Sequence, residues 1–397
     1  MDNRGISMSF NFDEPINRRG TDSTKWNVGD NELPMWVADM DFQTAPEVLE
    51  AMRERLAHGV FGYADVTDEW YQAYIDWWRD RHGFEMNRDW LIFCTGVVPA
   101  ISSMVRKLTT PNENVVIQTP VYNIFFNSII NNGCRVLENP LVYENGSYFM
   151  DFDDLEKKLA DSQTTLMILC NPHNPIGKIW DRETIARVGE IAYRHHVTVI
   201  SDEIHCDITE PEKAYVPFAS VSDNCRRISA TCIAPTKAFN LPGIQTAAVS
   251  VPDPVLRHKV WRALNTDEIA EPNSFATAAA ISAFEKGADW LTALCTYISE
   301  NKKIAVSYIK TEIPDIFVVE SDATYLLWID VSALSGDSTE IATFIREKSG
   351  LYLSAGAAYG DAGKHFLRMN VACPKATCME GLERLKAGIM QYKHGLE

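Results

Sequence analysis

Short apolar runs alternate with helical patterns through the middle of this 397-residue chain. Four of these runs have the length and composition of buried strands, and they cover residues 114–118, 166–170, 197–200 and 228–233. Residues 181–196, between the second and third runs, have an acidic start, a basic end and one apolar face, as a capped amphipathic helix does. Continuous apolar strands separated by helices predict an α/β fold with a parallel sheet covered on both faces.

The last third of the chain has a different pattern, in which helices and strands are mixed. Helices are expected over residues 300–312, 339–348 and 379–392, and strands over 325–329 and 366–371. This mixture predicts a smaller α+β domain, and the lack of a Gly/Ser linker predicts that it packs against the larger one. We expect an N-terminal segment (residues 1–47) that packs with the small domain, a large domain (48–285) and a small C-terminal domain (286–397).

The composition argues against several classes of protein. Hydrophobic residues make up 46% of the chain and charged residues 23%, which is typical of a folded globular protein. The net charge of −17 disfavours nucleic acid and anionic membranes as partners. There is neither a signal-peptide pattern nor an apolar run near the ~18 residues of a membrane span. Nine scattered cysteines without Cys-x-x-Cys spacing predict no metal site and a cytoplasmic location.

Three polar side chains follow three of the predicted strands. Asn174 lies in an Asn-Pro-His-Asn-Pro turn after the second run, Asp202 ends the third, and Lys237 follows the fourth. In parallel sheets, ligands bind at the carboxyl ends of the strands. One crevice could therefore hold all three side chains.

An amine, a carboxylate and an amide are the groups with which a protein holds pyridoxal phosphate. Lys237 would be the covalent anchor and the group that moves the proton. Asp202 would keep the pyridine nitrogen protonated, which would pair a carboxylate that is otherwise costly to bury. Asn174 would donate a hydrogen bond to the phenolic oxygen. The alternatives are a surface lysine at position 237 and a helix N-cap at position 202.

The phosphate and the ring of such a cofactor have candidate partners as well. Gly96, Val97 and Val98 begin a helical stretch, and the free amides of a helix N-terminus attract anions. Thr236 would be a second donor to the phosphate. Tyr122 could stack on the ring, although a core tyrosine would give the same sequence pattern.

An arginine in a predicted strand is the candidate for binding the substrate. Arg368 follows the apolar residues Phe366 and Leu367, and a buried guanidinium needs an anion. Its planar fork matches the two oxygens of an α-carboxylate. A structural ion pair is the alternative for this residue.

Taken together, these motifs resemble the fold-type I pyridoxal phosphate enzymes, the aspartate aminotransferase superfamily. Within it, the chain is most similar to the cystathionine β-lyase group of the MalY/PatB kind. The narrower resemblance rests on residues 33–42 (LPMWVADMDF), 61–63 (FGY), 96–101 (GVVPAI), 202–205 (DEIH) and 368–374 (RMNVACP).

The resemblance implies a mostly parallel seven-stranded sheet flanked by helices in the large domain, which would bind the cofactor. It also implies a homodimer with shared active sites, in which Tyr63 reaches the phosphate of the other subunit. His205 would lie beside the cofactor. Ala38, Asn174 and Arg368 would contact an amino-acid substrate.

Two departures from the aminotransferase pattern favour a lyase. His205 stands where many aminotransferases have a tyrosine, and Gln245 where they have a phosphate-binding arginine; both resemble the lyase group. The expected reaction is α,β-elimination of cystathionine, cysteine or related S-substituted cysteines to pyruvate, ammonia and a thiol. An aminotransferase acting on L-amino acids and 2-oxo acids is the alternative, and a non-catalytic amino-acid sensor is disfavoured by the acidic composition.

Overall fold

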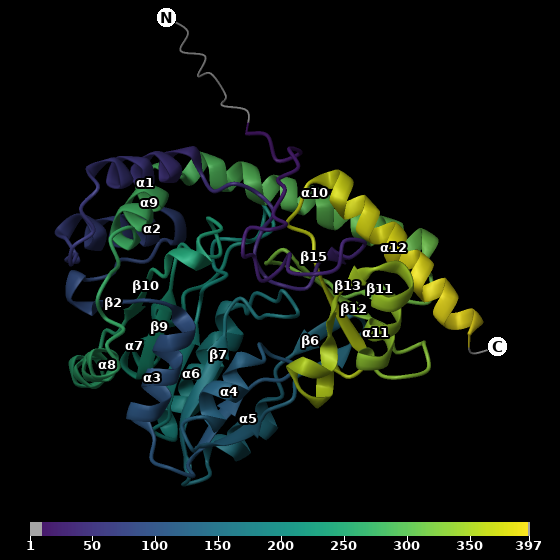
Figure 1. The fold of residues 1–397 in the computed structure, drawn as a ribbon. Helices are drawn as coiled ribbons and strands as arrows, with labels where there is room; N and C mark the ends of the chain where they lie inside the picture. Colours follow the sequence, from purple (N-terminus) through teal and green to yellow (C-terminus); the bar gives the residue numbers. More distant parts are fainter. Residues whose placement is uncertain (1–9, 396–397) are drawn as a thin grey trace, which may run out of the picture.

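The large domain is built around one seven-stranded sheet in the computed structural model, which describes residues 10–395 (Figure 1). In spatial order its strands are β2 (Leu91–Cys94), β10 (Ala247–Ser250), β9 (Ser229–Ile233), β8 (Thr198–Asp202), β7 (Thr164–Cys170), β3 (Asn114–Ile117) and β4 (Arg135–Glu138). Strand β10 is antiparallel to both neighbours, and the other adjacent pairs are parallel. The predicted α/β class with a mostly parallel seven-stranded sheet is confirmed.

Both faces of this sheet are buried, which explains the continuous apolar runs. Successive residues of a strand point to opposite faces. Leu166 and Ile168 of β7 belong to an apolar cluster with α3 (Val97–Leu108) and α8 (Pro254–Thr266). Met167 and Leu169 belong instead to a cluster with α5 (Phe152–Leu159) and α6 (Arg182–Arg194). The remaining helices and the hairpin of this domain are α4 (Ile124–Ile130), α7 (Asp223–Ile228), β5 (Val142–Glu144) and β6 (Ser147–Phe149).

A third, aromatic-rich cluster packs three further helices beside the sheet. These are α1 (Pro46–His58), α2 (Asp68–His82) and α9 (Ala276–Lys286), which lie together in Figure 1. The long helix α10 (Ala288–Glu312) leads from this group to the small domain. None of the helices formed by residues 10–395 combines the length and hydrophobicity that a membrane span requires.

The small domain has a four-stranded antiparallel sheet in the order β11-β12-β15-β14. Its elements are β11 (Phe317–Val318), β12 (Leu326–Asp330), α11 (Ser338–Ser349), β14 (Ser354–Ala355), β15 (Phe366–Asn370) and α12 (Lys375–His394). The predicted smaller α+β domain is thus present. In addition, β1 (Leu33–Pro34) pairs with β13 (Leu351–Tyr352) in parallel, so an N-terminal strand lies against this part of the chain. The residue boundaries of the three predicted parts remain a prediction.

Candidate active site

The carboxyl ends of β7, β8 and β9 open onto one cavity of about 1130 Å³. The predicted site residues that line it are Ala38, Gly96, Val97, Val98, Tyr122, Asn174, Asp202, His205, Thr236, Lys237 and Arg368. Tyr63 does not line it. The cavity is therefore lined by residues from the N-terminal segment, from the large sheet and from the small-domain strand β15, so that all three parts contribute to one site.

Lys237 projects into the cavity from a tight turn that follows β9. The turn is closed by two backbone hydrogen bonds, from Phe239 N to Pro235 O (2.8 Å) and from Leu241 N to Thr236 O (2.8 Å). The Lys237 amine donates to the carbonyl oxygen of Ala38 at 2.6 Å. Burial, together with the positive charge of Arg368, lowers the pKa of Lys237 to about 8. The neutral amine, which can accept a proton, is therefore a minor form near physiological pH, but it is far more abundant than for an ordinary lysine with a pKa of 10.5.

Asp202 ends β8 and is buried, with 4% of its surface exposed. Its Oδ1 accepts a hydrogen bond from Ile204 N at 3.2 Å. Within residues 10–395 no cation lies within salt-bridge distance of this carboxylate, and burial raises the pKa of Asp202 to about 6. A carboxylate in this environment is stabilised by a cation placed in the cavity.

Arg368 is a buried cation with no carboxylate partner in the described part of the chain. Its Nη1 donates to Asn174 Oδ1 (3.2 Å) and its Nη2 to the carbonyl oxygen of Trp36 (2.7 Å). Its Nε is buried without a hydrogen-bond partner, and the guanidinium lies 4.9 Å from the ring centroid of Tyr359. The alternative prediction for this arginine, a structural ion pair, is therefore not found within residues 10–395. The site offers a charge and unused hydrogen-bonding capacity to an anionic ligand.

His205 lies close to both cations of the site and is neutral. Burial, followed by the charges of Lys237 and Arg368, lowers the pKa of His205 to about 3. Its Nδ1 is buried and has no hydrogen-bond partner in the described part of the chain. This imidazole can exchange hydrogen bonds with a ligand without adding a charge.

The N-terminus of α3 borders the cavity, and the free amides of a helix N-terminus attract anions. Gly96 is the N-cap, and the helix begins at Val97 without an acidic residue in its first turn. A Cβ at position 96 would approach Pro99 Cδ to 3.2 Å. Gln245 lines the same cavity, so a neutral amide faces it where an arginine would supply a charge. A phosphate here would be held by amides and hydroxyls.

Tyr122 and Thr236 lie where the sequence analysis expects them, at the cavity wall. Burial raises the pKa of Tyr122 to about 12, so its phenol is neutral. Their contacts with a ring and a phosphate remain predictions.

The donor set fits pyridoxal phosphate. Within residues 10–395, one cavity is bordered by an amine with a lowered pKa, a carboxylate without an ion-pair partner, a helix N-terminus, and buried nitrogens of His205 and Arg368 that have no hydrogen-bond partner. Pyridoxal phosphate, or an amino acid bound to it, carries a group that can bind to each of these protein groups.

Sequence reasoning gave no role to some residues that shape the site. The carbonyl of Trp36 holds Arg368, and the hydroxyl of Tyr325 donates to Ala38 O at 2.9 Å beside the Lys237 amine. Asn370 donates to the carbonyls on both sides of Ala38, those of Val37 and Asp39 (both 2.6 Å). All four hydrogen bonds are accepted by backbone oxygens, and the identity of a side chain does not reveal what its backbone oxygen binds.

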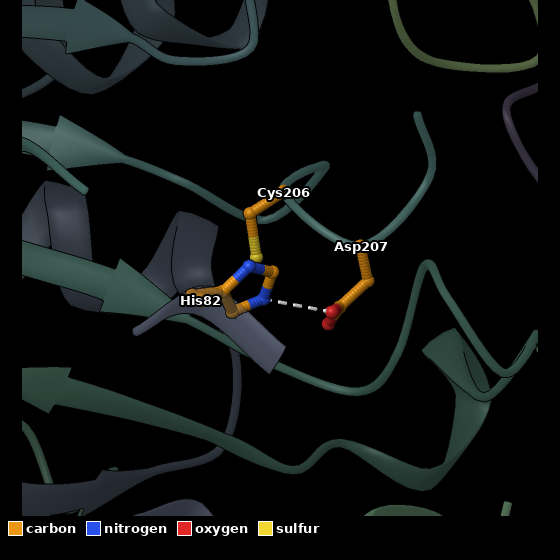
Figure 2. A group of neighbouring side chains, drawn as sticks. All are labelled: His82, Cys206 and Asp207. Carbon is orange, nitrogen blue, oxygen red and sulfur yellow. Dashed lines mark hydrogen bonds and ion pairs between the residues drawn. The ribbon is translucent and has the colours of Figure 1, made fainter. Parts of the chain in front are cut away.

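Behind the loop that follows β8 lies a second group of polar side chains. Figure 2 shows His82, Cys206 and Asp207 pointing toward one another, with His82 Nε2 2.9 Å from Asp207 Oδ1. The same oxygen also accepts from Trp77 Nε1 (2.9 Å) and lies 3.2 Å from Arg81 Nε. Burial raises the pKa of the Cys206 thiol well above its usual range, which disfavours the thiolate that binds metals. This group fixes α2 to the loop, and we assign no metal ion to it.

Comparisons with known proteins indicate the family of the chain. Residues 25–385 match the family model Aminotransferase class I and II. Cystathionine beta-lyase PatB of Bacillus subtilis is 42% identical over 96% of this chain and 100% of the relative, and protein MalY of Escherichia coli is 32% identical over 95% and 98%. The PLP-bound C-S lyase from Staphylococcus hominis has a TM-score of 0.90 and 31% identity, over 97% of this chain and 99% of that chain.

The fold and the site thus define a fold-type I pyridoxal phosphate protein. More narrowly, the chain belongs to the aminotransferase class I and II family, in the group that contains PatB and MalY. The resemblance stated from the sequence motifs is confirmed.

Proposed function

We propose that this protein is a pyridoxal phosphate-dependent carbon–sulfur lyase that converts cystathionine, cysteine or related S-substituted cysteines to pyruvate, ammonia and a thiol. The observation that carries the proposal is the grouping of Lys237, Asp202 and Arg368 around one cavity. This grouping occurs in a chain that matches a cystathionine beta-lyase over nearly its whole length. The names of PatB and of the C-S lyase support the leaving-group chemistry.

Each residue of the site has a definite task in this reaction. Pyridoxal phosphate, when bound, supplies a ring that withdraws electrons and stabilises negative charge at the substrate α-carbon. Arg368 binds the substrate carboxylate and orients the α-hydrogen. Lys237 accepts the α-proton as a neutral amine and is positioned to return it to the departing sulfur. Asp202 would keep a proton on the ring nitrogen, and Asn174, which already accepts a hydrogen bond from Arg368, would contact the phenolic oxygen and the substrate carboxylate.

The competing aminotransferase activity is distinguished by one experiment. The protein is incubated with cystathionine and without any 2-oxo acid, and pyruvate and free thiol are measured. A lyase consumes cystathionine and water and releases pyruvate, ammonia and homocysteine in equal amounts. Turnover that begins only when a 2-oxo acid is added would show that the protein transfers amino groups instead.

The pKa of Lys237 leads to an expected pH profile for cofactor uptake. Only the neutral amine attacks an aldehyde, and its fraction rises as the pH passes through the pKa. We expect the rate at which the cofactor-free protein captures pyridoxal phosphate to increase and then level off above about pH 8. Stopped-flow absorbance between about pH 6.5 and 10 measures this rate. A rate that climbs steadily to the end of that range would indicate an ordinary lysine with a pKa near 10.5.

We further infer that the active unit is a homodimer and that it works in the cytoplasm. Tyr63 is fully exposed in the segment between α1 and α2, beside Phe61 with 52% of its surface exposed. A tyrosine and a phenylalanine exposed together favour a protein contact. The resemblance implies that Tyr63 serves the partner's phosphate site. The nine cysteines are free and buried, which suits a reducing compartment.

Subunit complementation tests the shared site. Tyr63→Ala and Lys237→Ala each remove one contribution from both sites of a homodimer. When the two variants are unfolded together and refolded, half of the sites in a mixed dimer recover both residues. We expect activity to reappear in the mixture, measured as pyruvate release. Two variants that stay as weak when mixed as when separate would contradict a site built from two chains.

A further inference from the structure

One wall of the active-site cavity is a stack of two aromatic rings and a cation that the proposed reaction does not use. The rings of Trp36 and Tyr352 are stacked with centroids 4.7 Å apart and planes 16° apart. The Arg346 guanidinium lies over the same tyrosine at 3.7 Å from its centroid. All three residues line the cavity together with Glu32.

The backbone fixes this stack in place. Strands β1 and β13 pair in parallel, and Met35 N donates to Tyr352 O at 2.9 Å, which holds the two aromatic residues side by side. Arg346 lies in the last turn of α11, which is capped at its C-terminus by Gly350 with φ +71°. A Cβ at position 350 would lie 2.5 Å from the carbonyl oxygen of Asn31, so the glycine allows the N-terminal segment to approach the helix.

The stack is continuous with the site that binds the substrate carboxylate. The carbonyl oxygen of Trp36 accepts a hydrogen bond from Arg368 Nη2 at 2.7 Å, while the indole of the same residue stacks on Tyr352. Two stacking steps of 4.7 and 3.7 Å then separate that indole from the Arg346 guanidinium. The wall therefore runs from Arg368, the candidate ligand of the substrate carboxylate, to a second arginine.

The two charged side chains of this wall, Arg346 and Glu32, form an ion pair. Arg346 Nε and Nη2 donate to Glu32 Oε1 and Oε2 at 2.6 and 3.0 Å. These hydrogen bonds lower the pKa of Glu32, so both groups are charged. The Arg346 side chain keeps 36% of its surface exposed and that of Glu32 keeps 22%, which leaves each accessible to a ligand.

The ring of Tyr352 has no free face on which a flat apolar ligand could stack. One face of the Tyr352 ring is covered by Trp36 and the other by Arg346, so the ring presents its edge to the cavity. The edge of an aromatic ring carries partial positive charge and attracts anions. This part of the wall thus favours a charged ligand over an aryl group.

We propose that Arg346 and Glu32 form the subsite for the leaving group and select thiols that end in an α-amino acid. The distal carboxylate would bind Arg346, and the distal ammonium would bind Glu32. Homocysteine, the leaving group of cystathionine, has this chemistry, and simple S-alkyl cysteines do not. This inference rests on the proposed lyase function and adds a substrate preference to it.

A series of substrates tests the subsite on the wild-type holoenzyme. Cystathionine is compared with S-(3-carboxypropyl)-L-cysteine, which lacks the distal ammonium, with S-(3-aminopropyl)-L-cysteine, which lacks the distal carboxylate, and with S-propyl-L-cysteine, which lacks both. Charged hydrogen bonds of this kind are worth about tenfold or more each, so we expect kcat/KM to fall by at least about that factor per charge removed. Values within about threefold across the series would overturn the proposal.

Matched variants locate the effect at Arg346. In Arg346→Met we expect kcat/KM to fall about tenfold or more for cystathionine and to stay within about twofold for S-propyl-L-cysteine. Lys348→Met removes an exposed cation from the same helix outside the cavity and should leave both values unchanged. Equal losses on both substrates would indicate a structural role, and no loss on either would also overturn the proposal.

Two further results keep this test separate from that of the proposed function. If Arg346→Met does not fold, Arg346→Lys keeps the charge without the paired hydrogen bonds and should show a smaller loss confined to cystathionine. If the wild-type protein releases pyruvate from none of the four substrates, it is the lyase function that fails. Pyruvate release from all four at similar rates leaves the lyase function intact and removes only the subsite.

Discussion

Replacing Lys237 with alanine should lower the rate of pyruvate release from cystathionine by about 10³–10⁴-fold or more. The substitution removes the covalent anchor of the cofactor and the base that takes the α-proton. Burial keeps the pKa of this amine near 8, so at neutral pH it acts as a base that a surface lysine cannot replace. Pyruvate is measured by a coupled assay, and cofactor retention is measured by absorbance after gel filtration.

The fold should survive this substitution. Lys237 donates a hydrogen bond to the carbonyl oxygen of Ala38, and the hydroxyl of Tyr325 continues to satisfy that oxygen when the amine is gone. The matched control is Lys259→Ala, which removes an exposed lysine from α8 and should leave the rate unchanged. Added methylamine should restore part of the activity of the alanine variant, because a small amine fits the space left behind. Activity within tenfold of wild type would show that another group takes the proton.

The core of the fold could be predicted from the sequence because central parallel strands are buried on both faces. Strands β3, β7, β8 and β9 all coincide with predicted apolar runs. Strands β2, β4 and β10 do not coincide with any predicted run, and only the resemblance to a known family implies a sheet of seven strands. All three have four residues, and β10 (Ala-Ala-Val-Ser) has too few large β-branched side chains to stand out from its neighbours.

The chemistry at the strand ends could be predicted for a similar reason. Asn174, Asp202 and Lys237 follow adjacent parallel strands, and strand order alone brings such residues to one edge. The role of Tyr63 could not be derived in this way, because its proposed partner is on another chain. The pattern of one sequence does not show which residues of a second subunit lie beside Tyr63.

The pairing of Glu32 with Arg346 could not be predicted from the sequence. The two residues are 314 positions apart, and both have the composition of ordinary surface charges. They meet because a two-residue strand near the N-terminus pairs with β13 in the small domain. A pairing this short has no recognisable periodicity, so the structure is needed to find it.

Asp202→Asn should separate catalysis from stability, and the two effects should have opposite signs. Folding raises the pKa of Asp202 to about 6 from a usual value of 3.8, so the folded chain holds this proton more strongly than the unfolded chain. Above about pH 6 the folded state must keep a buried charge, which lowers the stability of the cofactor-free protein. The neutral asparagine removes that cost, and we expect the thermal midpoint of the cofactor-free variant at pH 7.5 to equal or exceed that of wild type.

Catalysis should respond in the opposite direction, because a neutral amide cannot hold a proton on the ring nitrogen. Without that proton the bound cofactor withdraws electrons weakly, and we expect kcat for pyruvate release to fall by about 10²–10³-fold. Asp181→Asn is the matched control, since Asp181 caps α6 and asparagine is an equally good N-cap. A variant that loses both stability and activity would place Asp202 in the framework of the fold. One that retains the wild-type rate would mean that its carboxylate does not face the cofactor.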